Sequence, residues 1–144
     1  MKTALITHAD CLDHVTPAGH PEQVARLEHV LHALAPLDLN RITAPLAADD
    51  DLLRIHPKPY IDEIKQMRPE SGTFQVDADT HMSPGSVDAA YRAAGGTLRA
   101  VDFARCDFWC TLRVHHVIRR SGCSIAIGRC AATYHSAPDV LGHS

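Results

Sequence analysis

The longest regular pattern of apolar positions runs over residues 84–102. Ser83 stands where a helix N-cap is expected, and Pro84 suits the first helical position. Apolar side chains then recur at spacings of three and four, which predicts one buried helical face. Its members are Val87, Ala90, Tyr91, Ala94, Leu98 and Val101. Gly95 and Gly96 interrupt the pattern, and because an interior glycine costs about 1 kcal/mol relative to alanine, the pair predicts close packing on a neighbouring backbone.

The preceding residues show shorter patterns that alternate between strand and helix. Strands are predicted over residues 3–7, 41–44 and 74–76, and helices over residues 21–34, 52–55 and 59–67. Three successive acids at 49–51 are interpreted as the N-cap and first-turn charge of the second helix, in preference to a cation site. The alternation predicts an α/β fold built on a sheet.

Composition narrows the class of protein. The chain has 144 residues, a formal net charge of −3 and a pI of about 6.4, which favours one modest domain and argues against a nucleic-acid binder. No apolar run approaches the roughly 20 residues that span a bilayer, and no signal peptide is apparent, so we expect no membrane association. Five cysteines without a secretory signal indicate reduced thiols and a cytoplasmic location.

Two polar loops contain candidate site residues. The loop after the first strand holds His8, Asp10, Cys11, Asp13 and His14. These residues lack the spacing of a metal motif, so capping of nearby helices is the favoured interpretation over metal binding. The loop before the long helix brings Asp77, Asp79 and His81 to the start of that helix, an arrangement that suits the rim of a site.

Four segments, in this order and spacing, resemble the N-terminal part of the histone deacetylase family, particularly its bacterial acetoin-utilisation and acetylpolyamine amidohydrolase members. They are the opening strand with His8; Gly19-His20-Pro21-Glu22 with Arg26-Leu27; Leu52-Leu53-Arg54-Ile55-His56 with Pro59-Tyr60; and Asp77, Asp79-Thr80, Met82-Ser83-Pro84-Gly85-Ser86 with Ala89-Ala90 and Ala93-Ala94-Gly95. Each segment alone is a weak signal, whereas the four in register over residues 1–104 are a strong one.

The resemblance implies a fold and a reaction. The fold would be the N-terminal part of an arginase/deacetylase-type domain, truncated here, with a mainly parallel sheet flanked by helices. The reaction would be zinc-dependent hydrolysis of an acetyl-amide on a lysine or polyamine. In the family two aspartates and one histidine hold the zinc, which activates a water molecule, while a histidine pair moves protons and a tyrosine helps to hold the oxyanion.

The resemblance also assigns residues around the entrance to the acetyl-lysine tunnel. It implies that Asp79, and after it Asp77, is the acidic residue that binds the substrate backbone or amine. The alternative, that Asp79 caps a turn with Thr80, explains the residue at least as well in a chain without the active centre. His20 and His56 fall near that entrance by the same comparison. From the sequence alone, both are better explained as polar residues that flank helices beside prolines.

Beyond residue 104 the sequence departs from the family pattern. His115 and His116 are the candidates for the catalytic histidine pair. No Asp-x-His motif, second aspartate loop or Gly-Gly-Tyr segment follows them, so we assign no metal ligand in this chain. We therefore expect an incomplete, inactive portion of a deacetylase that does not itself bind Zn²⁺. The open edge of its partial sheet predicts self-association.

Residues 105–144 form a second segment of distinct composition. They are rich in cysteine and arginine and contain no lysine or glutamate. Cys106, Cys110, Cys123 and Cys130 do not have the paired spacing of common zinc modules, so a shifted reading frame or a disordered tail is the favoured explanation. The alternative function is a non-catalytic α/β fragment or interaction module whose Cys/His tail binds metal.

Overall fold

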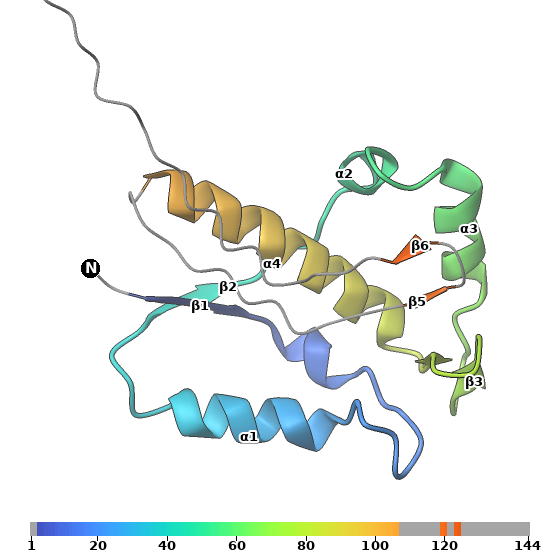
Figure 1. The fold of residues 1–144 in the computed structure, drawn as a ribbon, viewed down its shortest axis with the longest axis horizontal. Coiled ribbons are helices and arrows are strands. Elements are labelled where there is room, and N and C mark those ends of the chain that lie inside the picture. Colours follow the sequence, from blue (N-terminus) through green and yellow to red (C-terminus); the bar gives the residue numbers. More distant parts are fainter. Residues whose placement is uncertain (1–2, 107–118, 121–122, 125–144) are drawn as a thin grey trace, which may run out of the picture.

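The computed structural model describes residues 3–106, 119–120 and 123–124 (Figure 1). At its centre, β1 (Ala4–Thr7) pairs in parallel with β2 (Asn40–Thr43), and Ile6 lies opposite Ile42. Parallel strands need a crossover connection, and α1 (Val24–Leu34) lies in that connection. The sequence predictions for both strands are confirmed to within one residue.

Two helices cover the β1–β2 pair from opposite sides (Figure 1). The long helix α4 (Ser86–Cys106) packs directly on β1, and α1 lies across the other side of the pair. The described part of the chain is therefore layered helix on sheet on helix, as the alternation of strands and helices predicts.

The remaining elements are short and surround the end of α4 that begins at Ser86. They are the 3-10 helix η1 (Ala9–Leu12), α2 (Asp49–Leu53), α3 (Lys58–Gln66), the antiparallel pair β3 (Phe74–Gln75) and β4 (His81–Met82), and the antiparallel pair β5 (Arg119–Arg120) and β6 (Cys123–Ser124). The strand β4 lies in a segment that the sequence predicts to be a loop. The described residues contain no helix that is long and apolar enough to cross a membrane.

Of the paired glycines of α4, Gly95 meets the backbone that follows β2, as predicted, whereas Gly96 faces side chains. A Cβ atom at Gly95 would lie 2.7 Å from the amide nitrogen of Ala47 and would also collide with the carbonyl oxygen of Pro45. The same approach lets the Ala47 amide donate a 3.0 Å hydrogen bond to the Tyr91 carbonyl. The glycine therefore allows α4 to dock on this segment through a backbone hydrogen bond.

The predicted apolar face of α4 is only partly correct. Val87 is buried, but Leu98 and Val101 are 37% and 46% exposed. The face that turns inward carries small side chains instead, at positions spaced by three and four residues. These positions are Ser86, Ala89, Ala93, Gly96 and Ala100. Because small side chains let a helix lie close to a sheet, they mark the contact face here, whereas Leu98 and Val101 do not.

Two helix starts also differ from prediction. α1 begins at Val24 and not at Pro21, because Gly19, with φ of 84°, and a hydrogen bond from the His20 amide to the Pro17 carbonyl close a separate turn before it. α4 begins at Ser86 and not at Pro84. The Ser83 hydroxyl does not cap that helix, because it is engaged with the loop that follows η1.

The three acids before residue 52 lie in the first turn of α2, which confirms the first-turn charge, but the N-cap is Ala48 and not one of the acids. Asp51 accepts a 3.1 Å hydrogen bond from the Ala48 amide, and Asp49 binds both Lys65 and the Tyr91 hydroxyl. These contacts fasten α2 to α3 and α4. They give Asp49 and Asp51 structural roles.

Candidate functional site

The polar loop after β1 is tied to the start of α4 by a buried network of hydroxyl groups. The Ser83 hydroxyl donates to the Asp13 carbonyl and accepts from the Val15 amide, both at 2.9 Å. The Ser86 oxygen accepts from the Ser83 amide and lies 2.7 Å from Nδ1 of His14. Both serines are almost completely buried, at 2% and 0% exposure, so these hydrogen bonds fix the loop against the helix.

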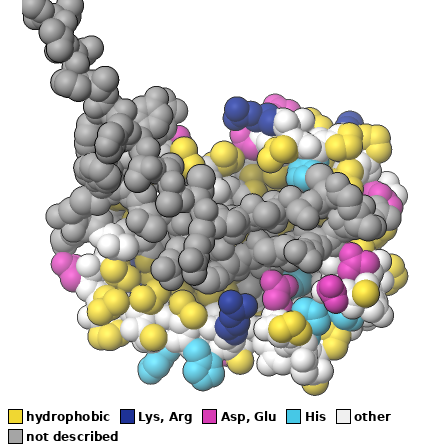
Figure 2. Space-filling view, viewed as in Figure 1, with side chains coloured by type: hydrophobic (Ala, Val, Ile, Leu, Met, Phe, Trp, Pro, Cys, Tyr) yellow, Lys and Arg dark blue, Asp and Glu magenta, His cyan; other side chains and the backbone are white. Residues whose placement is uncertain are grey.

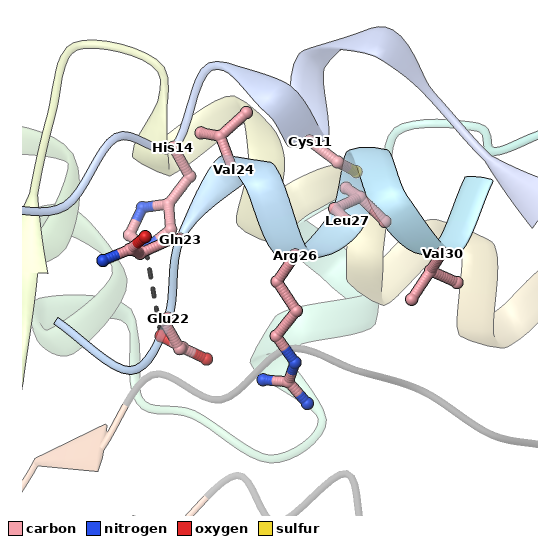
Figure 3. A pocket seen from close by; sticks show the side chains of 8 residues that line it. All are labelled: Cys11, His14, Glu22, Gln23, Val24, Arg26, Leu27 and Val30. Atoms are coloured by element: carbon pink, nitrogen blue, oxygen red, sulfur yellow. Dashed lines mark ion pairs between the residues drawn. The ribbon is translucent and has the colours of Figure 1, made fainter. Parts of the chain in front are cut away.

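The imidazole of His14 links this network to the segment before α1. Its Nδ1 is hydrogen-bonded to the Ser86 hydroxyl, and its Nε2 faces the Glu22 carboxylate across 4.0 Å (Figure 3). Gly85 permits this arrangement, because a Cβ atom there would lie only 2.5 Å from the carbonyl oxygen of Asp13.

A pocket of about 110 Å³ lies beside this network, between the loop after β1 and α1 (Figure 3). Cys11, His14 and Glu22 contribute to its wall together with side chains of the first turns of α1. Burial raises the pKa of the Cys11 thiol, so the sulfur is protonated and weakly nucleophilic at neutral pH.

An ion pair joins the same loop to the middle of α4. Nε of Arg92 donates to Asp10 at 2.8 Å, and Nη1 donates to the Ala44 carbonyl at 2.9 Å. The hydrogen bond from Arg92 is the main reason that the pKa of the Asp10 carboxyl lies below its usual value. One side chain thus connects η1, the end of β2 and α4.

This ion pair predicts a dependence of stability on pH. Because the pKa of Asp10 is lower in the folded chain, its contribution is complete above the unfolded pKa of about 4 and is lost as the pH falls through the folded value. We expect Asp10→Asn to weaken the pH dependence of the urea midpoint between about pH 6 and about pH 3. Asp50→Asn, at an exposed acid on α2, is the matched control, and an equal effect of both substitutions would contradict the prediction.

The loop between β3 and β4 carries the two predicted substrate-binding acids. Its ends are closed by a 2.8 Å hydrogen bond from the Val76 amide to the Thr80 carbonyl. Oδ1 of Asp77 accepts from the Asp79 amide at 2.9 Å, and Nε2 of His20 lies 3.1 Å from the Asp79 carbonyl. The structure therefore brings Asp77, Asp79 and His20 together, with Asp79 exposed at the surface.

Histidines and acids gather around this loop. The rings of His20 and His81 meet edge to face, with centroids 5.3 Å apart. Nδ1 of His81 is buried and has no hydrogen-bond partner in the described part of the chain. Figure 2 shows acidic and histidine side chains close together at the end of the molecule where β3 and the segment before α1 lie. This end is the candidate functional site.

The other predicted histidines have different positions. His56 is 6% exposed and packs against Tyr60, with ring centroids 5.2 Å apart, so it belongs to the α2–α3 junction. That position supports the interpretation of His56 as a polar residue that flanks a helix beside a proline. His115 and His116 lie outside the described residues, as do most residues of segment 105–144.

Sequence reasoning missed the residues that hold the site in place. His14, Ser86 and Arg92 connect distant segments, and no local pattern marks such contacts. One signal was present: Ser83 and Ser86 are three residues apart at a helix start, which is the spacing of a capping box. In this chain the Ser86 side chain accepts a hydrogen bond from the Ser83 amide, as in a capping box, whereas the Ser83 hydroxyl bonds to the loop after η1.

The residues described do not by themselves fit a zinc ion. Among residues 3–106 and the two short C-terminal strands, no group of three histidine, cysteine, aspartate or glutamate side chains could hold a metal.

Comparison with known proteins decides the family. The family model described as the histone deacetylase domain matches residues 20–123. The chain belongs to the histone deacetylase family. The match ends within segment 105–144, so the boundary at residue 104 stays a prediction.

Two relatives illustrate this membership. A probable deacetylase from Methanothermobacter thermautotrophicus is 31% identical over 107 residues, which cover 73% of this chain and 32% of the relative. A histone deacetylase-like amidohydrolase from Pseudomonas aeruginosa is 36% identical over 91 residues, covering 59% of this chain and 23% of the relative. The chain of this deacetylase-family member thus spans a third or less of their length.

A solved structure supports the fold. The crystal structure of the HDA15 HD domain superposes with a TM-score of 0.60 at 17% identity, over 75% of this chain and 33% of that one. The predicted α/β architecture of the arginase/deacetylase type, present in part, is confirmed by this match.

Proposed function

We propose that this chain forms the substrate-entrance side of a zinc-dependent deacetylase-family amidohydrolase, with Asp79 as the carboxylate that binds the substrate. The ligand class is an acetylated lysine or an acetylated polyamine. Within these 144 residues we propose binding without hydrolysis, because no Asp-x-His motif follows His116 in the sequence.

The position of Asp79 carries the proposal. Its backbone is held on both sides, by Asp77 at the amide and by His20 at the carbonyl, while the residue itself is exposed. A fixed backbone orients the side chain before any ligand arrives, which reduces the entropy lost on binding. One carboxylate oxygen of Asp77 accepts a hydrogen bond from the Asp79 amide, so Asp79 is the better placed of the two acids to bind a ligand.

The chemistry of a carboxylate fits the proposed ligands. An ionised carboxylate only accepts hydrogen bonds, and a peptide N–H or a polyamine ammonium group only donates them. Hydrogen bonds of this charge-assisted kind are shorter and stronger than neutral ones. In this scheme Asp79 holds the donor groups of the ligand outside the tunnel and leaves the acetyl-amide for the catalytic centre of the complete enzyme.

Substitution of Asp79 tests the proposal. Asp79→Asn keeps the size of the side chain and the backbone contacts but removes the charge, so we expect the Kd for an Nε-acetyl-lysine peptide to rise about tenfold. Titration of the isotope-labelled chain by NMR measures this Kd. Asp50→Asn changes the net charge equally and should leave the Kd unchanged.

Two results would contradict the proposal. Equal binding by the Asp79→Asn chain and the unsubstituted chain would remove Asp79 from the ligand site. Release of acetate by the isolated chain with added zinc, abolished by His115→Ala or His116→Ala, would show that hydrolysis takes place within these residues.

A further inference from the structure

The imidazole of His20 contacts two backbone segments through its two nitrogens. Nδ1 accepts a 3.1 Å hydrogen bond from the Glu22 amide, and Nε2 lies 3.1 Å from the Asp79 carbonyl. Residues 20 and 79 are far apart in the chain, so this ring joins the turn before α1 to the β3–β4 loop.

The first contact determines the direction of the second. Because Nδ1 accepts from the Glu22 amide, the proton of a neutral imidazole lies on Nε2. Nε2 therefore donates to the Asp79 carbonyl. A protonated ring carries a proton on Nε2 as well, so this hydrogen bond is retained in both charge states.

The turn that carries His20 is itself well determined. Gly19 adopts a φ of 84°, which favours glycine, and the His20 amide donates to the Pro17 carbonyl at 3.1 Å. On its other side the ring rests against His81, the first residue of β4. The donor nitrogen is thus presented to Asp79 from a fixed position.

We propose that His20 is a positioning residue that aims Asp79, acting through the Asp79 carbonyl and not by touching the ligand. Its functional consequence rests on the proposed role of Asp79 in binding. Together His20 and Asp77 hold the two ends of the Asp79 residue, and the loss of either contact lets the carboxylate rotate away from the ligand.

Two substitutions separate the hydrogen bond from the ring contact. The side-chain nitrogen of glutamine lies as many bonds from Cα as Nε2 of histidine, so His20→Gln retains the donor but loses the ring. His20→Phe retains a ring against His81 but loses the donor. Neither variant places an acceptor at the position of Nδ1, which lies one bond nearer Cα than the amide oxygen of glutamine. The two variants therefore differ in the donor to Asp79 and in the ring against His81.

The experiment measures amide hydrogen exchange at residues 76–80 in the full chain by NMR, followed by titration with the Nε-acetyl-lysine peptide. We expect His20→Phe to increase exchange of the Asp79 amide and to raise the Kd, each about fivefold. His20→Gln should restore both values to within about twofold of the unsubstituted chain. The urea midpoint of each variant checks that it is folded.

The two proposals fail in different ways. Unchanged exchange in His20→Phe, or equal effects of the two variants, would overturn the positioning role. If His20→Phe alone increases exchange but neither it nor Asp79→Asn changes the Kd, then His20 positions the loop and the proposed binding role of Asp79 is wrong.

Discussion

The substitution Gly95→Ala is expected to lower the free energy of unfolding by about 2–3 kcal/mol. The added methyl group meets the carbonyl oxygen of Pro45 and the backbone nitrogen of Ala47, and neither can move without shifting the segment after β2. Forcing them apart also lengthens the hydrogen bond from Ala47 to Tyr91. The gain in helix propensity, about 1 kcal/mol, offsets only part of this loss.

Urea denaturation followed by circular dichroism measures the change, and Gly96→Ala is the matched control. A Cβ atom at Gly96 would lie 3.2 Å from the Cβ of Ala44 and 3.6 Å from a methyl group of Ile6, so it meets side chains and not backbone. We expect Gly96→Ala to change the free energy of unfolding by no more than about 1 kcal/mol in either direction. Equal destabilisation by both substitutions would show that the effect does not arise at the Pro45–Ala47 contact.

The second large effect is expected from Ser86→Ala, with a loss of about 1–3 kcal/mol. This substitution removes the hydrogen-bond partner of the buried Ser83 amide and one partner of Nδ1 of His14. A buried polar group that loses its partner suffers the full cost of desolvation, because water does not reach it. The cost applies to two groups at once, although the cavity left behind is only one oxygen atom in size.

The same urea experiment measures this loss, and Ser71→Ala at an exposed position is its control. The imidazole nitrogen shifts of His14 give a second readout, because Nδ1 loses its hydrogen bond with the Ser86 hydroxyl. A Ser86→Ala chain with unchanged stability and an unchanged His14 spectrum would show that the network does not form as described.

The helices and strands could be predicted from the sequence because their signals are local. The β-branched runs at residues 3–7 and 41–44 became β1 and β2, and Gly95-Gly96 marked the close contact of α4. The inward face of α4 was not accessible from periodicity, since small residues are weak hydrophobic signals and the larger Leu98 and Val101 fit the same period.

The candidate site could be predicted from the sequence only in part. The resemblance indicated Asp79 and Asp77, and the structure places both in one loop beside His20. The partners of that loop could not be predicted, because a hydrogen bond between residues 20 and 79 or between residues 14 and 86 depends on how the chain packs and not on local spacing. His115 and His116 belong to residues that the structure does not describe.

The inward face of α4 sets an unequal tolerance to change on the two sides of one helix. Where α4 meets the segment after β2 at Gly95, even a single added Cβ atom would collide with backbone atoms. On the outward side, Leu98 and Val101 already project beyond the packed layer. Sequence drift among variants of this chain can therefore alter the positions of Leu98 and Val101 widely in size and polarity, whereas the positions of Ser86, Ala89 and Gly95 are confined to small residues.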